Sequence, residues 1–204
     1  LSEASPVISS NTPGRYRFGS SGILVKPIDL KVCDEEGQEL PQGQKGELWI
    51  KGGNVMAGYW RNEKSTAETI VDGWLHTGDL GTMDAEGYVT VRGRSKNMLL
   101  TSSGQNIYPE EIESKLNNMP YVSESLIVLQ KEKLVALIYP DFDDAFAHGL
   151  QQADIIKVME ANRVELNQQL PNYSQISKVK IHFEEFEKTA KKSIKRFMYQ
   201  EAKG

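Results

Sequence analysis

Short apolar stretches separated by turn residues fill the first half of the chain. They lie at residues 23–25, 30–33, 46–51 and 87–91. Strands this short, mostly spaced by about ten residues, predict a small antiparallel β-barrel or sandwich. Before the last of them, residues 61–70 predict a short exposed helix, with Asn62 or Ser65 as its N-cap.

After residue 104 the pattern changes to helical spacing. Pro109 suits the first position of a helix, and the apolar residues that follow recur at i, i+4 and i+7 up to Met119. Glu110 and Glu111 fall in the first turn, where the helix dipole favours acidic side chains, and we expect them to be solvated. Adjacent helical residues diverge by about 100°, so they are not expected to act as an acid/base pair.

The remaining residues mix strands with a long helix. Residues 126–139 predict a β-hairpin, residues 155–170 an amphipathic helix ended by Pro171, and residues 179–183 a strand. A polar linker is expected at residues 141–144. Elements mixed in this way predict a compact α+β domain of about 110 residues with its own core.

A short cationic connector separates the two halves. Residues 92–97 have no periodicity, and we interpret them as a hinge. The predicted fold class is therefore α+β: a small antiparallel β-barrel subdomain in residues 1–93, followed by the hinge and a compact α+β C-terminal domain in residues 94–204.

Composition narrows the functional classes. The 204 residues are 39% hydrophobic and 25% charged, with a net charge of −4, so no electrostatic case exists for nucleic acid. The single cysteine, Cys33, cannot form an internal disulfide, which fits a cytoplasmic location. No apolar run approaches the roughly 20 residues that span a bilayer, whereas peripheral membrane association and oligomeric state stay open. RNA binding is disfavoured because no aromatic platform accompanies the basic residues.

Two motifs carry the candidate chemistry. GWLHTGDLG at residues 73–81 packs glycines around one carboxylate, Asp79, which is expected at a strand end. GRSKNMLLTSSGQNIYPEEIE at residues 93–113 follows it. With flanking segments at residues 1–8 and 46–60, these motifs resemble the adenylate-forming superfamily of acyl-CoA synthetases, peptide-synthetase adenylation domains and luciferases, and the resemblance touches most of the chain.

The resemblance implies roles for individual residues. Asp79 would hold the ribose hydroxyls of ATP, and Arg94 would also contact the nucleotide. Lys96 matches the pivot about which a small C-terminal domain rotates between two half-reactions, and Gly104 matches a glycine beside the pantetheine arm of CoA.

Residues 1–8 look like the end of a Thr-Glu motif of this superfamily. Ser2 stands where the family has threonine at its nucleotide site, and Glu3 matches the glutamate that coordinates Mg²⁺. The chain begins inside this motif and contains no Ser/Thr/Gly-rich phosphate loop ending in Pro-Lys. We therefore expect a C-terminal fragment that is inactive by itself.

The basic C-terminal run, residues 186–197, departs from the family. The family motif is similar to Thr-x-x-Gly-Lys-Ile-x-Arg, and its lysine bridges the carboxylate and the α-phosphate during adenylation. With Ile194 and Arg196 as anchors, Ser193 occupies the position of that lysine. A hydroxyl cannot neutralise charge as an ammonium does. We expect Lys192 to replace it, with Lys191 as the second candidate.

The sequences of residues 3–7 and 102–113 are most similar to those of bacterial long-chain fatty acyl-CoA ligases. The implied reaction joins a fatty acid to ATP with Mg²⁺, giving an acyl-adenylate and pyrophosphate, and then forms a thioester with coenzyme A. Two alternatives stay open: an adenylation domain that loads a carrier-protein thiol, and a non-catalytic module that binds a nucleotide or a partner.

Overall fold

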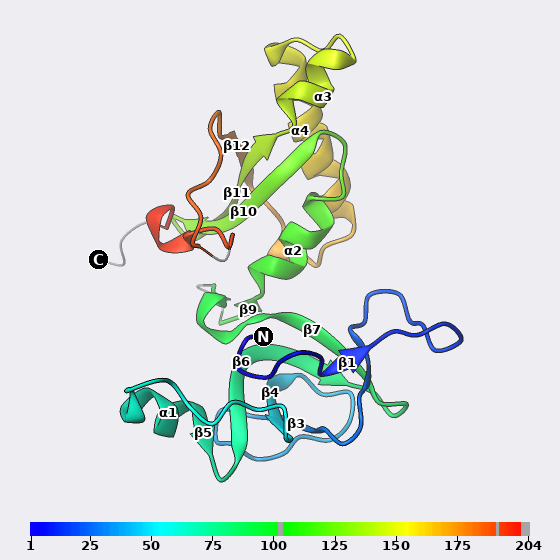
Figure 1. Ribbon diagram of the computed structural model, residues 1–204. Coiled ribbons are helices and arrows are strands. Elements are labelled where there is room, and N and C mark those ends of the chain that lie inside the picture. The colour runs from blue at the N-terminus through cyan, green and yellow to red at the C-terminus, as the bar shows by residue number, and fades with distance from the viewer. Residues whose placement is uncertain (102–103, 191, 201–204) are drawn as a thin grey trace. The chain divides into compact units, whose positions relative to one another are not determined.

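The computed structural model describes residues 1–101, 104–190 and 192–200. Lys191, the second lysine candidate, lies outside the described residues, as do residues 102 and 103 of the second motif. The chain forms two compact units, Leu1–Lys96 and Asn97–Gly204, each with its own core (Figure 1).

The first unit is built on a curled, fully antiparallel sheet (Figure 1). The sheet has the order β1-β2-β7-β6-β4-β3, and β5 pairs with β6 outside that path. Its strands are β1 (Ser9–Ser10), β2 (Gly22–Leu24), β3 (Asp29–Cys33), β4 (Gly46–Lys51), β5 (Ile70–Val71), β6 (Trp74–Met83) and β7 (Tyr88–Arg94). Because β1 and β3 end the path without pairing to each other, the sheet is an open half-barrel.

One face of this sheet forms the core of the first unit. Period-two alternation turns apolar side chains of β3, β4 and β7 to the same side, namely Leu30, Val32, Leu48, Ile50 and Val89. On the other face, Lys31 and His76 flank Trp49 in register, and the rings of Trp49 and His76 stack at 3.7 Å. His76 therefore has a packing role in this unit.

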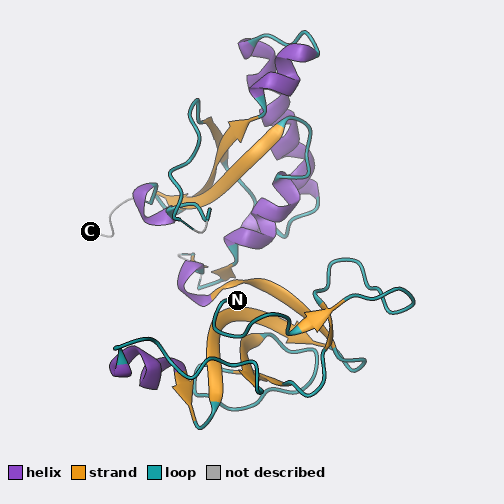
Figure 2. Ribbon diagram, viewed as in Figure 1, coloured by secondary structure: helices purple, strands orange, loops and turns teal. Residues whose placement is uncertain are grey.

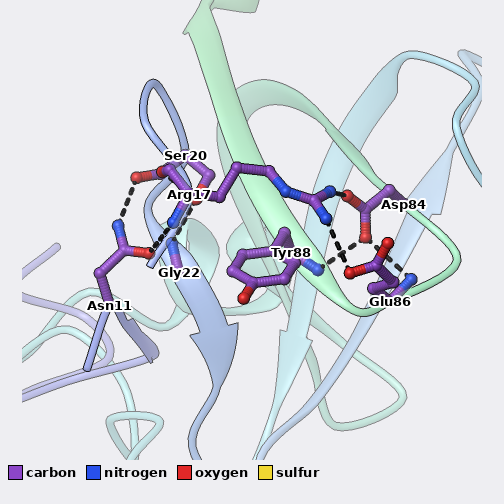
Figure 3. A network of polar contacts seen from close by, with 7 residues as sticks. All are labelled: Asn11, Arg17, Ser20, Gly22, Asp84, Glu86 and Tyr88. Carbon is purple, nitrogen blue, oxygen red and sulfur yellow. Dashed lines mark hydrogen bonds and ion pairs between the residues drawn. The ribbon is translucent and has the colours of Figure 1, made fainter. Parts of the chain in front are cut away.

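A polar network fastens the loop before β2 to the turn between β6 and β7 (Figure 3). The guanidinium of Arg17 pairs with Asp84 and, at 2.8 Å, with Glu86. It also lies 4.1 Å from the centre of the Tyr88 ring, within the range of a cation–π contact. Asn11 accepts the Arg17 amide at 3.1 Å, so the loop is held at both its backbone and its side chain.

The short helix predicted near residue 61 is present as α1 (Glu63–Thr69), and Asn62 is its N-cap. The Asn62 side chain accepts the amide of Ser65 at 3.0 Å.

The second unit contains a three-stranded sheet with helices on one side (Figure 2). Strand β10 (Val122–Gln130) pairs antiparallel with β11 (Lys133–Pro140), which pairs parallel with β12 (Lys178–Ile181). The helices are α2 (Pro109–Leu116), α3 (Phe142–Ala147) and α4 (Gln152–Gln168), and β8 (Leu99–Leu100) pairs with β9 (Asn106–Ile107).

Different segments pack on the two faces of this sheet. Ile127, Ala136 and Ile138 pack with residues of α2 and α4, whereas the alternate residues Leu126, Val128, Val135 and Leu137 pack with Phe186. Ile194 and Tyr199 also pack on the second face. The C-terminal run is therefore part of the core and covers the face that the helices leave open (Figures 1 and 2).

The predicted α+β class, with its small antiparallel sheet in the first part, is confirmed. Two local expectations were wrong. Residues 92–94 belong to β7, in which Gly93 and Arg94 pair with β6. Residues 141–144 cap and begin α3, because Asp141 accepts the amide of Asp144 at 3.0 Å. Among the described residues, no helix combines the length and apolar character needed to cross a membrane.

Candidate active site

Asp79 and Arg94 face each other across β6 and β7. The Nε of Arg94 lies 2.7 Å from Oδ1 of Asp79, and the Asp79 side chain is 21% exposed. The expectation that Asp79 ends a strand was wrong: β6 continues through it to Met83, with a bulge in its pairing to β7 after Leu80. The paired strands β6 and β7 provide Asp79 and Arg94 with a rigid backbone.

Hydrogen bonds between side chains and the backbone fix the stretch of β6 before Asp79. The amide of Gly78 donates to Oε1 of Glu47 at 2.8 Å, and the amide of Asp79 donates to Oγ1 of Thr77 at 3.0 Å. Thr77 in turn donates to the carbonyl of Leu48 at 2.7 Å. Since Gly78 has φ = +67°, the backbone favours glycine at this position.

The Asp79 carboxylate keeps free acceptor capacity. Its Oδ1 is engaged by Nε of Arg94, and an ionised carboxylate offers about four acceptor sites in all. Burial raises the pKa of Asp79; the positive charge of Arg94 opposes the rise and the negative charge of Glu3 adds to it.

Glu3 is held beside residues 55–59. Its carbonyl accepts the amide of Met56 at 2.8 Å, and its Oε1 accepts the hydroxyl of Tyr59 at 3.2 Å. No cluster of three or more metal-binding side chains occurs among the described residues. A single carboxylate fits Mg²⁺, which is commonly held by one or two carboxylates together with substrate phosphates. Ser2, its neighbour, is exposed.

Lys96 is the last residue of the first unit. It lies in a 3₁₀ turn, Ser95–Asn97, directly after β7, and its side chain is exposed. The Oγ of Ser95 donates to the carbonyl of Gly78 at 3.3 Å, which ties the start of this turn to the Asp79 motif.

Gly104 lies in the turn between β8 and β9. It is exposed, has φ = +76°, and a Cβ at this position would meet no atom within 4 Å. Its amide donates to the carbonyl of Thr101 at 3.0 Å. The backbone conformation alone therefore favours glycine, independently of any contact with CoA.

The C-terminal run folds into a tight hairpin. The amide of Thr189 donates to the carbonyl of Ser193 at 2.8 Å, and Lys188 forms an antiparallel bridge with Ile194. Lys192 has φ = +60° and is exposed, as is Ser193. Lys192 therefore occupies a left-handed position, where glycine is favoured.

Ion pairs occupy most of the cations of this run. Lys188 lies 2.8 Å from Glu124, Lys195 lies 3.4 Å from Glu187, and Nη1 of Arg196 lies 2.8 Å from Oε1 of Glu113. The hydrogen bond to Glu124 raises the pKa of Lys188. Within the described residues, no group partners the ammonium of Lys192. Among the described cations of the run, Lys192 therefore remains available to bind a ligand.

Comparison with known proteins decides the family. The profile of the AMP-binding enzyme family matches residues 1–60, and the profile of the AMP-binding enzyme C-terminal domain matches residues 96–202. The chain belongs to the AMP-binding enzyme family.

Individual relatives agree with this family. The chain is 44% identical over 125 residues to a long-chain-fatty-acid–CoA ligase of Escherichia coli O6:H1, across 61% of this chain and 22% of that protein. It is 42% identical over 120 residues to the fatty acid–[acyl-carrier-protein] ligase ScoC of Streptomyces coeruleorubidus, across 59% and 23% of the two chains. The match thus spans about a fifth of the length of these relatives.

A solved structure gives the same result for the fold. The anthranilate CoA ligase AuaEII, in complex with anthranoyl-AMP, superposes with a TM-score of 0.81 and 29% identity, over 98% of this chain and 37% of that chain.

Sequence reasoning missed Glu110 and Glu113 of this AMP-binding enzyme chain. The side chain of Glu113 is buried, and Glu110, expected to be solvated, is only 29% exposed. Both approach Arg196, and Glu110 also accepts the side-chain amide of Asn97 at 2.6 Å. A signal was available: Glu113 is one residue after Ile112 and three before Leu116 on the apolar stripe, so it borders the buried face.

Proposed function

We propose that this chain is part of an enzyme that activates a carboxylic acid with ATP and transfers the acyl group to a thiol. In the first step a carboxylate oxygen attacks the α-phosphorus of ATP. The new phosphorus–oxygen bond gives an acyl-adenylate, and pyrophosphate leaves. In the second step a thiolate attacks the acyl carbon, a thioester forms, and AMP leaves. Membership of the AMP-binding enzyme family supports this class of reaction.

The observation that carries the proposal is the pair of Asp79 and Arg94. A carboxylate can accept two hydrogen bonds from a ribose diol, and the contact with Nε of Arg94 uses only part of the acceptor capacity of Asp79. Arg94 fixes the orientation of that carboxylate and brings a positive charge to it. The pair is thus suited to an adenosine nucleotide, with Asp79 as acceptor and Arg94 as its positioning partner.

Glu3 would hold Mg²⁺ together with the phosphates of ATP, and Ser2 would lie beside the nucleotide. The ion supplies charge neutralisation on the phosphates when it is bound. Lys192 would donate to the reacting carboxylate and the α-phosphate, where charge develops. Lys96 is the proposed pivot between the half-reactions, and Gly104 the proposed neighbour of the CoA arm.

A long-chain fatty acid is the proposed substrate. The relative from Escherichia coli is named for that substrate and is 44% identical over 125 residues. The proposed acceptor is coenzyme A, and a carrier-protein thiol is the second candidate because the ScoC relative is named for that acceptor. An aromatic acid, as in the name of the solved AuaEII structure, is the alternative substrate class.

The first experiment measures ATP–pyrophosphate exchange by the full-length protein with palmitate and with an aromatic acid. We expect palmitate-dependent exchange, which falls about 100-fold or more in Lys192→Ala. Lys195→Ala is the matched control, because that lysine is paired with Glu187, and it should change exchange little. Failure of every carboxylic acid to support exchange would contradict the enzyme class. Unchanged exchange in Lys192→Ala would rule out the proposed role of Lys192.

The second experiment offers coenzyme A or a phosphopantetheinylated carrier protein to the enzyme with its acyl-adenylate. Faster thioester formation on coenzyme A supports the proposal, and faster formation on the carrier protein supports the alternative. The 204 residues by themselves should form no thioester, since they contain no phosphate loop. Turnover by this chain alone would contradict that expectation.

A further inference from the structure

A buried ion pair joins the C-terminal run to helix α2. The guanidinium of Arg196 meets both carboxylate oxygens of Glu113, with 2.8 Å between Nη1 and Oε1, and the two side chains are 14% and 9% exposed. Oε1 of Glu113 also accepts the amide of Ile127 at 2.7 Å. This two-point geometry fixes direction as well as distance, so α2, β10 and the run are held together.

The same cluster reaches the first residue of the second unit. Glu110, one helical turn before Glu113, lies 3.7 Å from Nη2 of Arg196. Its Oε1 accepts Nδ2 of Asn97 at 2.6 Å. Asn97 follows Lys96 directly, so a continuous set of polar contacts connects the residue after the proposed pivot to Arg196.

A second contact fixes the other strand of the hairpin. Lys188 is paired with Glu124 at 2.8 Å, opposite Ile194 in the hairpin bridge, and Ile194 packs on the sheet. Arg196 therefore anchors one end of the hairpin and Lys188 the other. Between them lies the turn that carries Lys192.

We propose that Glu113 is a positioning residue, which acts through Arg196 to fix the hairpin that presents Lys192. This inference rests on the proposed function. A buried ion pair is weak evidence for stability, since apolar replacements are often as stable. Its distinctive contribution here is orientation, because a lysine on a tight turn depends on how the base of its hairpin is held.

The test compares the two half-reactions in the full-length enzyme. Glu113→Gln keeps the shape of the side chain but loses its charge. We expect it to lower palmitate-dependent pyrophosphate exchange on the order of 10- to 100-fold. Thioester formation from supplied palmitoyl-adenylate and coenzyme A should stay near wild type, because that step does not use Lys192. Since Glu113 acts through Lys192, Glu113→Gln should change the residual exchange of Lys192→Ala by no more than about twofold.

Glu160→Gln is the matched control. It breaks another Glu–Arg pair of the second unit, between Arg163 and the exposed Glu160 of α4, and should leave both half-reactions unchanged. If Glu113→Gln does not fold, Arg196→Lys is measured instead; it keeps the positive charge, loses the two-point geometry and should show the same split.

Three outcomes would overturn the inference. Equal losses in both half-reactions would show a general structural role for Glu113. Unchanged exchange in a folded Glu113→Gln enzyme, with exchange lost in Lys192→Ala, would reject the positioning role and leave the proposed function intact. Absence of exchange in the wild type with every acid would reject both.

Discussion

The backbone amide of Lys192 donates a hydrogen bond to the carbonyl oxygen of Thr189, 2.9 Å away. This contact closes the hairpin turn and leaves Lys192 with φ = +60°. The family motif that the run resembles has glycine at this position and lysine at the next. The chain thus carries its lysine at the residue whose backbone suits it least.

Replacing Lys192 with glycine should stabilise the fold. Glycine adopts this backbone without the penalty of a Cβ, and part of the gain is offset by its larger entropy in the unfolded chain. We expect the free energy of unfolding of this chain in urea to rise by up to about 1 kcal/mol. Lys195→Gly is the control: Lys195 has φ = −76° and an ion pair to lose, so it should lower stability. A loss of stability in Lys192→Gly would contradict the claim that the backbone of Lys192 is strained.

Moving the lysine by one residue should preserve activity. The double variant Lys192→Gly with Ser193→Lys restores the family order of glycine and lysine in the hairpin. In the full-length enzyme we expect at least about 10-fold more palmitate-dependent pyrophosphate exchange than in Lys192→Gly alone. Exchange as low as in the single variant would show that residue 193 cannot reach the site from this hairpin.

Gly81 should not tolerate a side chain. A Cβ there would lie 2.5 Å from the carbonyl oxygen of Thr90 and 2.9 Å from Leu48, in the sheet beside Asp79. Gly81→Ala should lower the free energy of unfolding by about 1 to 3 kcal/mol in urea denaturation. The control is Gly53→Ala, where a Cβ would meet nothing within 4 Å, and its stability should change little. Equal effects of the two variants would contradict the packing argument.

The raised pKa of Asp79 predicts a pH dependence of stability. A folded pKa above the ordinary value of 3.8 means that the native state binds this proton more tightly than the unfolded chain. The wild type therefore loses stability as pH rises from about 3.8 through the folded pKa, and the penalty persists above it. Asp79→Asn has no such penalty, so its unfolding free energy minus that of the wild type should increase between about pH 3 and about pH 7.

Asp154 supplies a control of opposite sign. The hydrogen bond from Lys157 lowers the pKa of Asp154, so that carboxylate adds stability above its unfolded pKa and loses it in acid. The unfolding free energy of Asp154→Asn, minus that of the wild type, should therefore decrease over the same range. Parallel trends for the two variants would reject the assignment to Asp79.

Local patterns in the sequence determined the elements of this protein and its candidate residues. Two apolar runs around a polar turn predicted the hairpin of β10 and β11, and Asn62 was one of two predicted caps of α1. Sequence motifs identified Asp79 and Arg94 as candidate residues, and they showed that Ser193 stands at the position of the family lysine. These features depend on neighbours a few residues apart, which a sequence displays directly.

Contacts between distant segments were decided by the tertiary structure alone. Arg196 and Glu113 are 83 positions apart, and nothing in either neighbourhood specifies the other. The same holds for Lys188 and Glu124, whose pairing leaves Lys192 as the described cation of the run without a partner. A charge on a surface and a charge in a buried pair look alike in sequence, because burial depends on which chain segments pack over it.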